Sequence, residues 1–101
     1  MSMLHTVNKS PFNNDALSKC LQCAQPGSSI LFIEDGVYAS REGTTFTDSV
    51  KEALKDKQVY VLQPDLDARG MNSSLIDGIK TVDYSGFVDL TTEHDSVQSW
   101  L

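Results

Sequence analysis

The stretch Ser29-Ile30-Leu31-Phe32-Ile33-Glu34-Asp35-Gly36 determines the fold, because consecutive large apolar residues end abruptly at two carboxylates and a glycine. A strand with one face in water alternates apolar and polar residues, whereas a strand covered by helices on both faces is apolar throughout. We therefore predict a strand in the interior of a parallel sheet. Ligands bind beyond the carboxyl ends of such strands, so Glu34, Asp35 and Gly36 stand at a candidate functional edge. The alternative is that Asp35-Gly36 only turns the chain into the next helix.

Strand-like and helix-like segments alternate along the rest of the chain. Further strands are expected at residues 3–7, 59–62 and 79–82. Helices are expected over residues 15–25, from residue 47, over residues 65–69 and after Asp83, whose side chain can cap a helix start. No element is predicted for the tail, although Trp100 needs a surface to pack against. The alternation favours an α/β fold with a small parallel sheet of about four to five strands between two helix layers.

Length and charge restrict the class of protein. The 101 residues predict a single domain over residues 1–101, which buries roughly 65% of its extended surface. Such a core is thin for a three-layer fold, so association with other chains is expected. The formal charge of −6 argues against direct binding of nucleic acid, because that affinity comes mainly from lysine and arginine.

The expected location is the cytoplasm. No apolar run approaches the roughly 20 residues of a membrane span, and the first residues lack the basic and apolar regions of a signal peptide. Two cysteines are too few for the disulfide framework of a small secreted domain, which agrees with a reducing compartment.

Cys20 and Cys23 have the CxxC spacing of redox and zinc sites. A reactive cysteine of the redox type lies at a helix amino terminus, whereas Cys20 is expected about two turns inside its helix. A zinc site would need His5 and His94, and neither stands at a ligand-like distance along the chain. We therefore expect no metal and no cofactor.

Two interpretations of Cys20 stay open at this point. Free cysteine is often a small apolar filler on a packed helix face. Alternatively, Cys20 is reached from an interface or cleft and its thiolate takes sulfane sulfur as a persulfide. Exposure of the thiol distinguishes the two.

The remaining polar candidates favour structural roles. A histidine within a strand, such as His5, is usually a satisfied structural residue rather than a general base. His94 lies between two acids and is expected to be exposed, as a contact residue. Asp65, Asp67 and Arg69 are interpreted as a solvated helix face.

Four ordered segments then resemble one family from end to end. They are residues 3–12 (MLHTVNKSPF), 31–39 (LFIEDGVYA), 59–62 (VYVL) with 65–70 (DLDARG), and 82–91 (VDYSGFVDLT) continuing through Trp100. This chain resembles the DsrH/TusB family. The resemblance implies the DsrEFH-like three-layer fold and a place as the small subunit of a heterohexamer, with two copies each of three related subunits.

The resemblance also implies partners and a chemistry. The expected sister chains are DsrE/TusD-like and DsrF/TusC-like, and the complex passes persulfide sulfur to a DsrC/TusE-like acceptor, in sulfur oxidation or on the way to 2-thiouridine in tRNA. The principal acceptor cysteine of the family belongs to the DsrE/TusD subunit, and residues 63–78 of this chain contain no cysteine. Cys20 matches the cysteine of DsrH-type members, whereas Cys23 matches no family role.

The prediction is therefore a non-catalytic or auxiliary subunit of a sulfurtransferase complex, with Cys20 as a candidate auxiliary persulfide carrier. Trp100, Tyr84, Phe87 and His94 are the candidate contacts with sister chains. One alternative is a stand-alone sulfurtransferase that uses Cys20. The other is a flavodoxin-like ligand-binding or signalling domain with a metal at Glu34 and Asp35; a phosphoacceptor receiver is disfavoured because the third strand ends in Gln63-Pro64.

Overall fold

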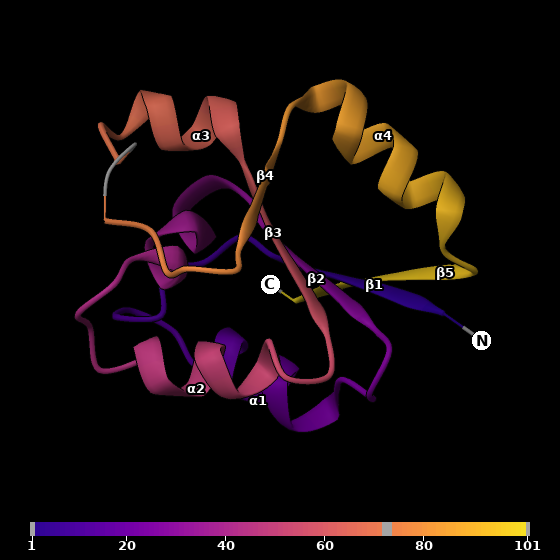
Figure 1. The fold of residues 1–101 in the computed structure, drawn as a ribbon, viewed down its shortest axis with the longest axis horizontal. Coiled ribbons are helices and arrows are strands. Elements are labelled where there is room, and N and C mark those ends of the chain that lie inside the picture. The colour runs from indigo at the N-terminus through magenta and orange to yellow at the C-terminus, as the bar shows by residue number, and fades with distance from the viewer. Residues whose placement is uncertain (1, 72–73, 101) are drawn as a thin grey trace.

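The computed structural model describes residues 2–71 and 74–100, and its centre is a five-stranded parallel sheet (Figure 1). The strands lie in the order β4-β3-β2-β1-β5. Their bounds are β1 Met3–Val7, β2 Ser29–Phe32, β3 Gln58–Leu62, β4 Lys80–Val82 and β5 Ser96–Trp100. The apolar run that opens the sequence analysis is β2, the middle strand, so the predicted interior strand is confirmed.

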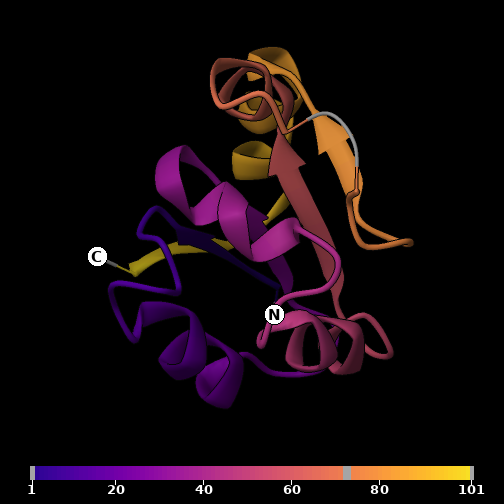
Figure 2. The ribbon, with the colours of Figure 1, turned by 90° about the vertical axis from the view of Figure 1, so that its left-hand side faces the viewer.

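Helices cover both faces of the sheet, which confirms the predicted fold class. The helices are α1 Ala16–Cys23, the 3-10 helix η1 Glu34–Ser40, α2 Thr47–Ala53, α3 Gln63–Ala68 and α4 Tyr84–Glu93. Helices α1 and α2 lie on one face and α4 on the other, as the turned view shows (Figure 2). The chain advances from β1 through β2 and β3 to β4, past α1, α2 and α3, and then returns past α4 to β5 at the opposite edge of the sheet. Reversing both the direction and the face keeps every crossover of one hand.

The two helix layers bury cores of unequal size. The larger core lies under α1 and α2, and its buried members are Val7, Leu17, Cys20, Ala24, Ile30, Phe32, Val37, Ala39, Val50, Ala53, Val59, Val61, Leu66, Met71 and Ile76. The smaller core under α4 consists of Leu4, Leu31 and Leu90, with partly buried apolar neighbours. Ile30 and Phe32 thus face one layer and Leu31 the other, as alternation along a strand requires. The α4 face is the thinly covered side of the sheet.

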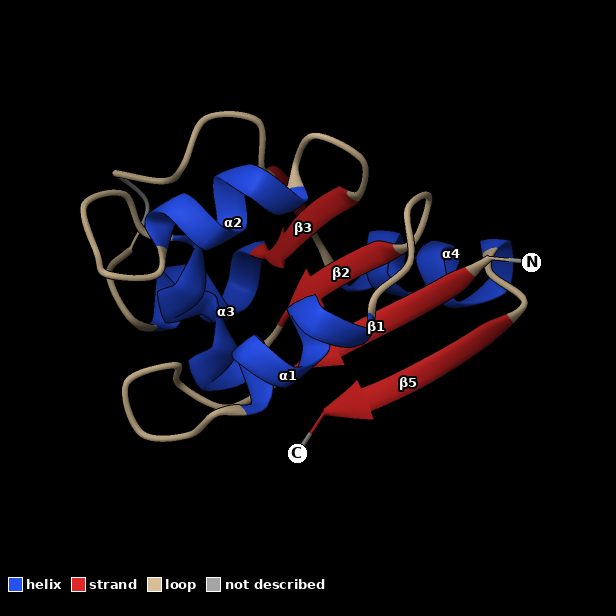
Figure 3. Ribbon diagram, turned by 90° about the horizontal axis from the view of Figure 1, so that it is seen from below, coloured by secondary structure: helices blue, strands red, loops and turns tan. Residues whose placement is uncertain are grey.

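The tail forms an edge strand that the sequence analysis did not predict. β5 pairs in parallel with β1 along its whole length, with Leu4 opposite Val97 and Val7 opposite Trp100 (Figure 3). Only Trp100 among its residues is even partly buried, so the segment shows little apolar pattern. The expected packing partner of Trp100 is the larger core.

Side chains accept backbone N–H groups at the start of two helices. Asp83 Oδ1 accepts the N–H of Gly86 at 2.8 Å, which confirms the predicted cap of α4. Before α1, Asn14 Oδ1 accepts the N–H of Ala16 at 2.7 Å. No helix among the described residues is long and apolar enough to cross a membrane.

Candidate functional site

Cys20 lies in the middle of α1 and points into the larger core, where it has no exposed surface. Burial, and secondarily the nearby Cys23, raises the pKa of the Cys20 thiol to about 12, against an opposing effect of Lys57. The thiol is therefore protonated and shielded at neutral pH. As an auxiliary persulfide carrier, Cys20 would need an opening of α1 that exposes it.

Cys23 ends α1 three residues later and is exposed. It borders a cavity of about 260 Å³ at the amino ends of β1 and β5. The other lining residues are Ser2, Met3, His5, Gln25, Ser28 and Ser96. The accessible thiol of the CxxC pair thus lines the same cavity as a histidine, an arrangement that residue spacing alone did not reveal.

His5 is buried and held by Trp100. The indole N–H of Trp100 donates to Nδ1 of His5 at 3.0 Å. An indole nitrogen can only donate, so Nδ1 of His5 carries no proton and the neutral ring has its proton on Nε2. Burial lowers the pKa of His5 below its ordinary value of 6.5. His5 is thus a buried strand histidine that Trp100 holds through Nδ1, which agrees with the structural role that the sequence favoured.

His94 is not exposed, and that expectation is wrong. Its Nδ1 lies 2.7 Å from the Leu90 carbonyl oxygen and its Nε2 lies 2.9 Å from Ser29 Oγ. A carbonyl oxygen only accepts, so Nδ1 donates, and in the neutral ring Nε2 accepts from the Ser29 hydroxyl. The partly buried imidazole thus joins the end of α4 to the start of β2, because one ring nitrogen bonds to Leu90 and the other to Ser29. Neither of the two neighbouring acids is a partner in these bonds.

The three aromatic contact candidates divide into two kinds. Tyr84 is 61% exposed, and Val88, one turn further along α4, is 60% exposed. Phe87 turns inward against the smaller core, and Trp100 packs on the larger one. Val97 is exposed on β5 and faces the α4 side, since it pairs with Leu4. Tyr84 and Val88 therefore form an apolar stripe on α4, and Phe87 supports it from beneath.

At the carboxyl ends of β2 and β3, the polar groups of η1 and α3 are joined to one another by hydrogen bonds. Glu34 has φ 50°, and Asp65 Oδ2 accepts its N–H at 2.6 Å. Arg69 donates to Asp35 Oδ1 from Nη2 at 2.9 Å and from Nε at 3.1 Å. Asp65 and Arg69 thus join α3 to η1, which corrects their interpretation as a solvated helix face.

Gly36 belongs to the same edge for a steric reason. A Cβ at Gly36 would collide with the Val7 carbonyl oxygen, so only glycine lets η1 approach the end of β1. Asp35-Gly36 therefore does turn the chain into a helix, the alternative left open above. In the described part of the chain, no group of three or more histidine, cysteine, aspartate or glutamate side chains is placed to hold a metal ion.

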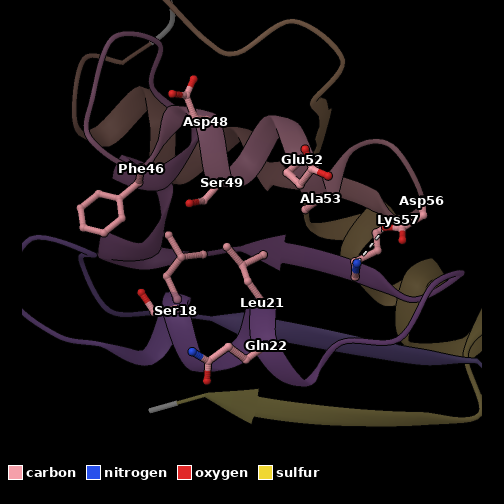
Figure 4. Close-up of a pocket in the computed structure, with 11 residues that line it drawn as sticks. Ser18, Leu21, Gln22, Phe46, Asp48, Ser49, Glu52, Ala53, Asp56 and Lys57 are labelled. Carbon is pink, nitrogen blue, oxygen red and sulfur yellow. Dashed lines mark hydrogen bonds and ion pairs between the residues drawn. The ribbon is translucent and has the colours of Figure 1, made fainter.

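A groove of about 580 Å³ runs between α1 and α2 (Figure 4). Leu17, Leu21, Phe46 and Ala53 give it an apolar floor, and Asp48, Glu52, Asp56 and Lys57 are among its polar margins. Lys57 Nζ is paired with Asp56 at 2.8 Å. Neither cysteine lines this groove, so the groove is not a candidate site for thiol chemistry.

The sheet order and the two helix layers define a small, doubly wound α/β domain whose first helix carries the thiols. The sequence model of the DsrH family, described as "DsrH like protein", matches residues 9–97. Protein TusB from Shigella flexneri is 36% identical over 98 residues, which cover 97% of this chain and 100% of that protein. The same identity and coverage hold for Protein TusB from Escherichia coli (strain 55989 / EAEC). The chain belongs to the DsrH family, and the expected membership is confirmed.

Solved structures show the same fold at low sequence identity. The ychN protein from E. coli superposes with a TM-score of 0.87 at 17% identity, covering 98% of both chains. A protein of unknown function from Methanobacterium thermoautotrophicum has a TM-score of 0.75 at 15% identity, covering 96% of this chain and 97% of the other. These likenesses concern the arrangement of the backbone alone.

Proposed function

We propose that this chain is the DsrH/TusB-type subunit of a cytoplasmic sulfur-relay complex. Its sister chains are DsrE/TusD-like and DsrF/TusC-like, with two copies of each of the three subunits. The complex passes persulfide sulfur to a DsrC/TusE-like carrier, for sulfur oxidation or for 2-thiolation of the tRNA wobble uridine. The chain itself binds neither nucleic acid nor membrane.

Family membership supports the relay, and the α4 face supports the subunit role. A helix normally buries its apolar stripe, yet Tyr84 and Val88 are both about three-fifths exposed. Beneath them the core is small, because its buried members among the described residues are Leu4, Leu31 and Leu90 alone. An exposed apolar stripe over a thin core is typical of a surface that a partner chain covers.

The division of labour between subunits follows from the placement of the cysteines. The resemblance to the family places the principal acceptor on the DsrE/TusD-like sister chain, and the absence of cysteine from residues 63–78 of this chain, which follow the third strand, agrees with that division. Cys20 is buried, so its proposed part as a carrier is auxiliary and conditional on opening of α1. The same burial disfavours a stand-alone sulfurtransferase, which would need a permanently accessible Cys20.

Co-expression with tagged sister subunits tests the assembly. The unaltered chain is expected to co-purify in equal amounts with both sisters. Tyr84→Asp and Val88→Asp place a charge on the apolar stripe and are expected to reduce recovery by about tenfold or more. Ser85→Asp adds the same charge beside the stripe on an exposed residue, and it serves as the matched control. Failure of the unaltered chain to join either sister would refute the proposed function.

A further inference from the structure

The groove between α1 and α2 is an apolar surface that the described residues leave uncovered. Its floor consists of Leu17, Leu21, Phe46 and Ala53. At the end where Phe46 lies (Figure 4), the ring of Phe12 packs against it edge to face, with ring centroids 5.4 Å apart. Phe12 is itself 56% exposed, so the aromatic pair continues the apolar surface beyond the groove. Contiguous exposed apolar surface with a polar rim is typical of an interaction site.

The two sides of the groove differ in charge. Along α2 and the turn that follows it, Asp48, Glu52 and Asp56 succeed one another at four-residue intervals, so they lie on one side of the helix. The α1 side contributes the uncharged Ser18 and Gln22. The groove therefore has an apolar floor, a neutral wall along α1 and an acidic wall along α2.

Lys57, the cation among the described lining residues, does not cancel this charge. Its Nζ lies 2.8 Å from Asp56 Oδ1, so that pair is neutral. Glu52 pairs with Lys55 at 2.9 Å, but the two side chains are 72% and 71% exposed, and water screens such a pair. Asp48 has no ion pair among residues 2–71 and 74–100. The acidic wall thus matches a partner of opposite charge.

A helix fits this groove better than an extended segment does. Both walls are helices, whose backbone groups bond mainly within the helix, so the groove offers no strand edge to an extended chain. An extended segment would leave its own N–H and C=O groups unpaired on the apolar floor, whereas a helix pairs them internally. The eight residues of α1 span about 12 Å, which matches apolar side chains at positions i, i+3 or i+4, and i+7 of an occupant helix.

We propose that the groove between α1 and α2 binds a basic amphipathic helix of a protein partner. The apolar stripe of that helix lies on Leu17, Leu21 and Phe46, and lysine or arginine side chains along one side of it pair with Asp48 and Glu52. The groove lies on the face of the sheet opposite to α4 (Figure 2), so the helix does not overlap the sister subunit proposed to cover the α4 stripe. The inference goes beyond the proposed function and does not depend on it.

Binding of a designed peptide to the full chain tests the proposal. The probe is a fluorescein-labelled helix of about 18 residues, with leucine at positions i, i+3, i+4 and i+7 and lysine elsewhere. Fluorescence anisotropy should show saturable binding that weakens as salt is added. A peptide of the same composition in scrambled order keeps the charge but loses the stripe, and it should bind at least about tenfold more weakly. Equal binding of both peptides would overturn the proposal, because net charge alone would then explain the attraction.

The acidic wall has a matched control on the other face of the sheet. Asp48→Asn combined with Glu52→Gln removes two exposed carboxylates one turn apart on α2, and is expected to weaken binding by about threefold to tenfold. Asp89→Asn combined with Glu93→Gln removes two exposed carboxylates at the same spacing on α4, and should change the affinity by less than about twofold. All four side chains are exposed, so the fold tolerates both pairs. Equal losses in the two double variants would refute the assignment to the groove.

Two other occupants of the groove would also overturn the proposal, and each has its own outcome. Peptide binding should persist when the sister subunits are added, and its loss on assembly would assign the groove to a sister chain. Ser49→Arg places a cation on the exposed rim and should weaken peptide binding by about tenfold without changing the sedimentation of the chain. Dissociation of a dimer by this variant would assign the groove to a second copy. A chain that fails to join its sisters would refute the proposed function and leave this test intact.

Discussion

Trp100, at the end of β5, donates its indole N–H to Nδ1 of His5 in β1, over a distance of 3.0 Å. The bond joins the last strand of the chain to the first, and both partners lie on the face that α1 covers. It also determines which nitrogen of His5 carries the proton. A single contact thus ties the edge strand to the sheet and determines the tautomer of a residue that lines the cavity at Cys23.

His5 makes stability depend on pH. Burial lowers its pKa in the folded chain below the ordinary 6.5, so the unfolded chain binds a proton more readily. The free energy of unfolding is therefore expected to decrease as the pH falls below about 6.5, with no contribution from this group at higher pH. Urea unfolding at several pH values measures the slope. His5→Asn should flatten it, and an unchanged slope in that variant would assign the dependence to other groups.

Gly36 is predicted to be intolerant of any side chain. Gly36→Ala forces a methyl group against the Val7 carbonyl oxygen and is expected to cost about 3 kcal/mol or more in the free energy of unfolding. The matched control is Gly27→Ala: Gly27 has φ 88° but no atom within 4 Å of an added Cβ, so only the backbone cost of about 1–2 kcal/mol applies. Chemical denaturation compares the two, and equal losses would contradict the close approach of η1 to β1.

Glu34 stores backbone strain that a substitution should release. It has φ 50°, a conformation that costs a residue with a side chain about 1 kcal/mol and that glycine adopts freely. Glu34→Gly removes that cost, but the extra freedom of glycine in the unfolded chain offsets about 0.4–1 kcal/mol of it, so the net gain in stability is expected to be small. Asp65→Ala removes the acceptor of the Glu34 N–H and should destabilise it by about 1–2 kcal/mol. Thermal unfolding of both variants tests the pair, and a loss of stability in Glu34→Gly would count against strain at this residue.

The two cysteines are predicted to differ sharply in reactivity. Iodoacetamide at neutral pH should modify Cys23 rapidly, whereas Cys20 should react only when urea opens the fold, because it is buried and its thiol is protonated. Cys20→Ala should cost about 1 kcal/mol, and Cys20→Ser somewhat more, since it buries a hydroxyl without an assigned partner. Rapid modification of Cys20 in the folded chain would show that α1 opens readily, and would favour Cys20 as the carrier.

The sequence predicted the layers of this fold better than its edges. β2 was predictable because a strand covered on both faces is apolar throughout. The cap of α4 by Asp83 was predictable because a capping residue bonds to the first turn of the helix that follows it. β5 was not, since an edge strand with one free side needs no apolar pattern and is placed only by pairing with β1. The same reason applies to the site. His94 meets Ser29 across 65 residues of sequence, and the cavity at Cys23 brings together residues from both ends of the chain.

The most direct test of the central claim is transfer of labelled persulfide sulfur to a DsrC/TusE-type acceptor by the sister subunits, measured with and without this chain. We predict that the sisters alone transfer sulfur slowly and that adding this chain restores the rate while all three co-elute as one complex. Equal transfer in its absence, with this chain eluting by itself, would contradict the account.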